Sequence, residues 1–171
     1  MKKILIIALI AGVFNGLNAC AQQDKSKRPS PPAKVSETIE SGATISIDYS
    51  QPSVKGRTIG KEIAPYGEVW RTGANEATVF ETDKDVTIEG KALPAGKYSL
   101  YTIPGTDKWT VIFNKTWKQW GTVYKEDEDV LRVDVKPAKA PATTEKMTFN
   151  IAKNGEVSLM WADTEVDFQV K

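Results

Sequence analysis

Four residues that can recognise a ligand lie within seven positions of one another: Trp70, Arg71, Asn75 and Glu76. They supply a flat apolar ring, a planar fork of five hydrogen-bond donors, an amide and a carboxylate. Such a set can bind a sugar or a carboxylate by stacking and paired hydrogen bonds. The same residues can instead be structural, with Trp70 in the core, Arg71 paired with an acid and Asn75 satisfying a turn. The sequence leaves both interpretations open.

The stretch that precedes these residues, 51–67, shows no regular pattern and is longer than a hairpin connection needs. Long ordered loops are often functional. Arg57 and Lys61 lie in this stretch. We expect them to add supporting positive charge to a site centred on Trp70, Arg71 and Asn75.

The composition restricts catalysis, because the sequence contains no histidine and a single cysteine, Cys20. A Ser-His-Asp or Cys-His triad and the usual zinc sites are therefore excluded. Carboxylates remain, so one alternative function is a carboxylate-based hydrolase of envelope glycans, with Glu68 or Glu76 as acid or base. That mechanism needs two carboxyl groups about 5 to 9.5 Å apart across a cleft. No motif indicates a metal ion or a cofactor.

Short runs of alternating apolar and polar residues follow one another along most of the chain. Such runs predict strands buried on one face. We therefore expect an all-β chain, a single antiparallel β-sandwich or jelly-roll-like domain over 34–171. Asn154-Gly155 predicts a tight type I′ hairpin, and 136–144, rich in Pro, Ala, Lys and Thr, is expected to be an exposed loop. The alternating runs are 45–49, 86–88, 109–113, 131–135, 147–151, 157–161 and 166–170.

The start of the sequence has the pattern of a bacterial export signal over 1–19: two lysines, an apolar stretch and small residues. Leu17-Asn18-Ala19-Cys20 resembles a lipobox, which predicts acylation of Cys20; the alternative is a cut before Gln22 and free secretion. Residues 20–33, polar and rich in proline, are expected to form a disordered tether. Loss of the two lysines from 23 basic side chains leaves 21 against 22 acidic ones. This nearly neutral charge gives no electrostatic indication of nucleic-acid binding.

Three segments resemble the domain of unknown function 2911 family: 66–78 (YGEVWRTGANEAT), 93–105 (LPAGKYSLYTIPG) and 109–115 (WTVIFNK). The resemblance covers roughly 35–171 and implies an exported protein of Bacteroidetes or related bacteria. It implies no activity. It marks as motif positions Trp70, Arg71, Gly73, Asn75, Gly96, Tyr98 and Tyr101.

From the residues and the resemblance we expect an exported cell-envelope protein, in the periplasm or at the outer membrane, that binds a small ligand, glycan or partner without catalysis. The second alternative, besides the hydrolase, is a structural or assembly lipoprotein without a small-molecule site. Exposed Trp117 or Trp120 could be a ligand platform or could anchor a loop. The membrane would be reached through lipid on Cys20, and the oligomeric state is left open. The candidate ligand-binding residues are Trp70, Arg71, Asn75, Glu76, Arg57, Lys61, Tyr98 and Tyr101.

Overall fold

The computed structural model describes residues 24–171, so the expected signal peptide (1–19) and Cys20 lie outside the described residues. The described chain is nearly all β, with two short 3-10 turns, η1 (Lys25–Lys27) and η2 (Glu126–Glu128). The predicted all-β fold is confirmed. Within residues 24–171, no helix has the length and apolar character needed to cross a membrane.

Six strands form the larger sheet, in the order β1-β2-β5-β8-β9-β10, and each neighbouring pair is antiparallel. The register places Ile47, Phe80 and Tyr98 opposite one another across β2, β5 and β8, so their side chains share one face. The strand bounds are β1 (Pro32–Thr38), β2 (Thr44–Ser50), β5 (Thr78–Thr82), β8 (Gly96–Ile103), β9 (Trp109–Asn114) and β10 (Asp129–Val135).

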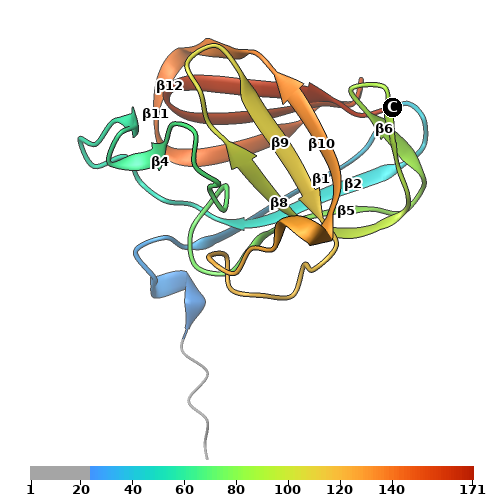
Figure 1. Cartoon of the computed structure of the whole chain (residues 1–171), viewed down its shortest axis with the longest axis horizontal. Helices are drawn as coiled ribbons and strands as arrows, with labels where there is room; N and C mark the ends of the chain where they lie inside the picture. Colours follow the sequence, from blue (N-terminus) through green and yellow to red (C-terminus); the bar gives the residue numbers. More distant parts are fainter. Residues whose placement is uncertain (1–23) are drawn as a thin grey trace, which may run out of the picture.

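A second layer is built around the long hairpin of β11 (Pro137–Ile151) and β12 (Glu156–Gln169), which lies behind β8, β9 and β10 in Figure 1. Its edges are extended by isolated bridges, Ile88 to Val170 on one side and Ser53 to Lys146 on the other. Ile88 belongs to a small antiparallel pair, and a further small pair is parallel. Their bounds are β6 (Val86–Ile88), β7 (Lys91–Leu93), β3 (Ile59–Gly60) and β4 (Ile63–Pro65).

The core fills the space between the two layers. Period-two alternation puts every second side chain of each strand into this space, and burying each large apolar side chain stabilises the fold by about 1.5–3 kcal/mol. Phe80 and Phe113 meet edge to face at the centre, with ring centroids 5.1 Å apart, and Phe168 of β12 packs against both. Other fully buried members are Ile45, Ile47, Leu100, Trp109, Met147 and Phe149.

The hairpin predicted at Asn154-Gly155 is present, but its turn is not the two-residue type. Gly155 N–H donates to Ala152 O at 2.9 Å, and Ala152 N–H donates to Glu156 O at 2.8 Å, so the connection has three residues. Gly155 has φ 86°, whereas Asn154 is not among the positive-φ residues. This is the geometry of a turn that ends in a left-handed glycine bulge. A side chain at Gly155 would also collide with the Val170 carbonyl, which lies 2.0 Å from an ideal Cβ.

The prediction of an exposed loop over 136–144 was wrong, because strand β11 already begins at Pro137. Its side chains are mostly exposed, so no apolar alternation marked the segment as a strand. The pairing with β12 is interrupted between Lys139 and Thr144, and Pro141 falls in that interruption. Proline is tolerated there because no ladder hydrogen bond is required from its nitrogen.

Candidate functional site

Several of the candidate residues lie on a loop whose two ends both pair with strand β8. Trp70 pairs with Thr102 through two backbone hydrogen bonds of 2.7 and 2.9 Å, and Thr78 pairs with Leu100 on the same edge. The intervening residues, 71–77, leave the sheet and return to it. Neighbouring ladder positions on β8 therefore fix both ends of this loop, which we call the motif loop.

The motif loop has an unusual backbone conformation. Thr72 and Asn75 have φ values of 49° and 61°, in the left-handed region that residues other than glycine seldom adopt. The hydroxyl of Thr78 donates to the Thr72 carbonyl at 2.7 Å and so holds the loop closed. At Gly73 an ideal Cβ would lie 2.7 Å from the Thr78 hydroxyl, so no larger residue fits. A strained backbone that is held in place by surrounding contacts is typical of functional sites.

A hollow of about 320 Å³ lies between the motif loop and the 51–67 stretch. We call it the arginine hollow, because Arg57 comes from one wall and Arg71 from the other. The structure therefore brings together two of the predicted site residues that are distant in sequence. The remaining lining residues are Ser30, Pro52, Glu62, Ile63, Ala64, Trp70, Gly73, Ala74 and Trp161.

Both guanidinium groups in the arginine hollow retain free hydrogen-bonding capacity. Arg57 donates only to backbone carbonyls, those of Val54 at 3.1 Å and Ser53 at 2.8 Å. Arg71 donates through Nε to the carbonyl of Gly73 at 3.3 Å. Among residues 24–171, neither arginine has a carboxylate within ion-pair distance. Since a guanidinium has five donors, several remain for another acceptor.

A buried tryptophan also belongs to the wall of the same hollow. Trp161 is buried, and its indole Nε1–H has no hydrogen-bond partner among the described residues. A buried donor without an acceptor costs about 1–3 kcal/mol. The ring itself is held firmly, because Trp70 stacks on it with centroids 5.3 Å apart and planes 9° apart. Trp109 in turn meets Trp70 edge to face at 6.3 Å.

The one carboxylate in the wall of the arginine hollow is that of Glu62. Its Oε2 accepts a hydrogen bond from the Thr58 backbone N–H at 3.0 Å. This bond lowers the pKa of the Glu62 carboxyl below its usual value. The Glu62 carboxyl is therefore ionised at neutral pH, and its hydrogen bond to Thr58 helps to hold the loop between these two residues.

A second hollow, of about 440 Å³, lies on the other side of Trp70 and Arg71. Its character is aromatic: Tyr101 and Tyr124 face each other with ring centroids 4.9 Å apart. Burial, aided by the hydrogen bond and charge of Asp129, raises the pKa of the Tyr124 hydroxyl to about 12. The remaining lining residues are Val69, Gly121 and Thr122.

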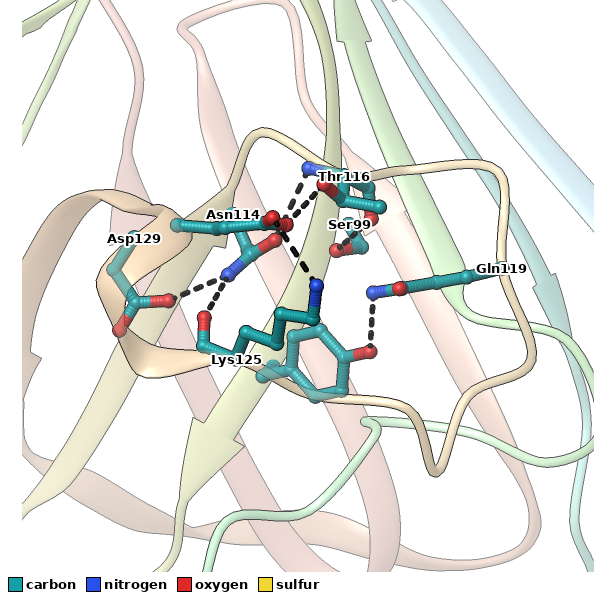
Figure 2. Close-up of polar contacts among 8 residues, drawn as sticks. Ser99, Asn114, Thr116, Gln119, Lys125 and Asp129 are labelled. Atoms are coloured by element: carbon teal, nitrogen blue, oxygen red, sulfur yellow. Dashed lines mark hydrogen bonds and ion pairs between the residues drawn. The ribbon is translucent and has the colours of Figure 1, made fainter.

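Part-buried polar contacts hold the connection between β9 and β10, which supplies Gly121, Thr122 and Tyr124 to the second hollow (Figure 2). Tyr101 donates its hydroxyl hydrogen to the Val123 carbonyl at 2.7 Å and accepts from Gln119 Nε2 at 3.1 Å. Asn114 Nδ2 donates to the Lys125 carbonyl at 2.8 Å and to Asp129 Oδ1 at 2.9 Å. These contacts tie the connection between β9 and β10 to the outer face of the sheet.

Two predicted residues of the motif loop contact the N-terminal segment and line neither of these two hollows. Asn75 Nδ2 donates to the Ser30 carbonyl at 3.1 Å. The Glu76 carboxylate pairs with Lys25 at 2.9 Å and with Arg28 at 2.8 Å. The hydrogen bond from Lys25, with a further one from Arg28, lowers the pKa of the Glu76 carboxyl. The described part of the expected tether thus lies against the domain.

The remaining predicted residues are placed apart from the arginine hollow. Tyr98 is a core residue whose hydroxyl donates to the Pro94 carbonyl at 2.8 Å, and burial raises its pKa. Lys61 is exposed and lines neither hollow. The sequence did not reveal Trp161 as a lining residue, because its alternating pattern indicated only a core position.

The fold and the site define a class: a single antiparallel β-sandwich that carries a hollow with two arginines. The family profile described as "Protein of unknown function (DUF2911)" matches residues 30–170. The chain belongs to this family, and the resemblance seen in its motifs is confirmed. Comparison with curated proteins gave no match, and comparison with solved structures gave none either.

Proposed function

We propose that this protein binds a small ligand with a carboxylate group in the arginine hollow, without catalysing a reaction. One observation carries the proposal: Arg57 and Arg71 both line this hollow, and neither has a carboxylate within ion-pair distance among residues 24–171. Planar guanidinium groups bind carboxylates by paired hydrogen bonds.

The size and walls of the hollow favour an acidic sugar. About 320 Å³ lies at the lower end of the range for small-molecule sites and suits a group of monosaccharide size. The stacked Trp70 and Trp161 supply an aromatic wall beside the donors. Ile63 and Ala64 add apolar residues to the lining.

The hydrolase alternative has less support. Hydrolysis of a glycoside needs two carboxyl groups in set positions, and the wall of the arginine hollow supplies one, Glu62. Glu76 forms ion pairs with the N-terminal segment. The pKa of its carboxyl is lowered, so the group is ionised at neutral pH and does not suit the role of general acid. The structural alternative predicted an Arg71 held in an ion pair, whereas Arg71 donates to a carbonyl and has no carboxylate within ion-pair distance among residues 24–171.

We further propose that the protein is exported to the periplasm or the outer membrane and anchored through acylated Cys20. The support is the apolar stretch and the lipobox-like Leu17-Asn18-Ala19-Cys20 of the sequence. Two or three acyl chains would make the anchor stable, because a single chain binds only marginally. Mass spectrometry of the mature N-terminus tests this: an acylated Cys20 supports the proposal, and an unmodified start at Gln22 overturns it.

Matched pairs of sugars that differ by one carboxylate test the binding proposal. Galacturonate with galactose, and N-acetylmuramate with N-acetylglucosamine, are added to the purified chain while its melting temperature is followed. At least one acidic member should raise the melting temperature, and its neutral partner should not. Arg71→Lys should weaken the shift, because lysine keeps the charge and loses the fork, whereas Lys61→Ala should leave it unchanged. Equal shifts with acidic and neutral sugars, or none with any acidic sugar, would contradict the proposal.

A further inference from the structure

The connection between β9 and β10 exposes three large apolar side chains. Trp117, Trp120 and Val123 have 38%, 49% and 46% of their surface exposed. Single exposed apolar residues are common on proteins, but these three lie within seven positions of one loop. We call residues 115–125 the tryptophan loop. Grouped exposed apolar residues of this kind mark an interaction surface.

The tryptophan loop is held in place, so its apolar side chains are fixed on the outside. Gly121 N–H donates to the Asn75 carbonyl at 2.9 Å, and Val123 N–H donates to the Trp120 carbonyl at 2.9 Å. Beneath the loop, Asn114 donates to the Lys125 carbonyl (Figure 2) and Tyr101 donates to the Val123 carbonyl, so two backbone acceptors of the loop are satisfied. The inner side of the loop is thus polar and paired, and the outer side is aromatic.

Positive charge accompanies the exposed aromatic residues. The tryptophan loop contains Lys115, Lys118 and Lys125, all exposed, and no acidic residue. Lys97 Nζ lies 5.2 Å from the centre of the Trp117 ring, within cation–π distance. Exposed tryptophans beside lysines are typical of segments that lie in the headgroup region of a bilayer.

The acidic run that follows the loop is compensated only in part by ion pairs. Glu126 and Asp129 both pair with Arg132, at 3.0 and 2.7 Å. Glu128 lies 3.8 Å from the Lys125 ammonium. Because Lys125 is one of the lysines of the loop, Lys115 and Lys118 are the loop lysines that have no acidic partner among residues 24–171.

The tryptophan loop lies beside the segment that leads to Cys20. Trp120 forms a β-bridge with Glu76, and Glu76 binds Lys25 and Arg28 of the N-terminal segment. In Figure 1, η1 and the connection between β9 and β10 both lie at the lower end of the molecule. Cys20 precedes Asp24 by four positions. Four residues span at most about 14 Å, so a lipid on Cys20 would hold this face close to a bilayer.

We propose that the tryptophan loop inserts its aromatic side chains into the headgroup region of a phospholipid bilayer. Trp117, Trp120 and Val123 enter the interface, and Lys115 and Lys118 attract anionic headgroups. The loop adds a second membrane contact to the proposed acyl anchor. It also orients the domain, with the β9–β10 connection toward the lipid.

The test uses the mature chain from position 20 with Cys20→Ser, which cannot be acylated, so the proposed anchor plays no part in the result. Vesicles of phosphatidylethanolamine and phosphatidylglycerol should sediment this chain, and added salt should weaken the binding. The double variant Trp117→Ala, Trp120→Ala should bind at least about tenfold more weakly. Tyr66→Ala is the matched control: Tyr66 is as exposed as Trp120, and its neighbour Gly67 bonds to Pro104, at the far end of β8 from Lys97.

Two outcomes would overturn the proposal: no sedimentation of the parent chain, or equal binding by the parent and the double variant. Melting curves of both variants check that they fold. A second measurement on the parent chain requires no substitution. Brominated lipids should quench its tryptophan fluorescence, and unchanged fluorescence would also contradict insertion.

Discussion

Trp70 and Trp161 stack face to face, 5.3 Å between ring centroids, although they belong to segments ninety-one positions apart in the sequence. The contact joins the motif loop to the second layer of the sandwich. It also fixes the Trp161 indole, whose Nε1–H has no partner among the described residues. Both members of the stacked pair line the arginine hollow.

Trp161→Phe should cost about 1–3 kcal/mol of stability, because the smaller ring leaves a cavity beside Trp70, and loss of the unsatisfied Nε1–H offsets only part of that cost. Affinity for an acidic ligand should fall at the same time, because the aromatic wall of the arginine hollow changes shape. Urea denaturation measures the first effect and calorimetric titration the second. Unchanged affinity would show that Trp161 does not shape the binding site.

Arg71→Lys should change the free energy of unfolding by less than about 1 kcal/mol. The reason is that Arg71 makes a single long hydrogen bond to a carbonyl and no ion pair among residues 24–171. Binding of an acidic sugar should weaken about tenfold or more. The matched control is Lys61→Ala, which removes an exposed cation outside both hollows. Severe unfolding of the Arg71 variant would instead make Arg71 a scaffold residue.

Glu76→Gln should release the N-terminal segment, because the carboxylate pairs with both Lys25 and Arg28. The cost in stability should stay below about 1 kcal/mol, since the Glu76 side chain is 40% exposed. Trypsin should cut after Lys25 and Lys27 faster than in the parent. Unchanged cleavage would contradict a docked segment.

The same ion pairs predict a pH dependence in the acid range. The pKa of Glu76 is lowered from 4.5 in the folded chain, so the folded state favours the charged form. This contribution is complete above pH 4.5 and is lost as the pH falls through the lowered pKa. The melting temperature of the parent should therefore fall more steeply with acid than that of Glu76→Gln, and parallel curves would contradict this.

Gly121→Ala should separate the tryptophan loop from the motif loop. An ideal Cβ at Gly121 would lie 2.6 Å from Arg71 Cδ and 2.9 Å from the Asn75 carbonyl oxygen. Overpacking of this kind typically costs about 1–3 kcal/mol. Thr122→Ala, at the exposed neighbouring position, should cost much less. Chemical denaturation compares the two, and equal stabilities would show that the loops are not in close contact.

The sequence predicted those features that depend on local pattern. Alternation identified the strands, and Asn154-Gly155 identified the β11–β12 hairpin, although its loop has three residues. Strand β11 was missed where its side chains are exposed and Pro141 interrupts the pairing, because burial is what produces alternation.

The arginine hollow could be anticipated only in part. The irregular 51–67 stretch and the motif loop were expected to act together, and the structure places Arg57 and Arg71 in one hollow. The direction in which the Asn75 and Glu76 side chains point could not be predicted. It depends on their contacts with Ser30 and Arg28, in a segment for which the sequence predicts a disordered tether. That Trp161 lines the hollow follows from its stacking on Trp70, a long-range contact without a local signal.

The most direct test follows the Trp161 indole N–H by NMR while an acidic sugar and its neutral partner are added in turn, with Trp161→Phe used to assign the signal. Trp161 lines the arginine hollow, so binding there should change the surroundings of its ring, and the resonance should move with the acidic sugar and stay in place with the neutral one. Saturating binding of the acidic sugar with an unmoved Trp161 signal would contradict the account.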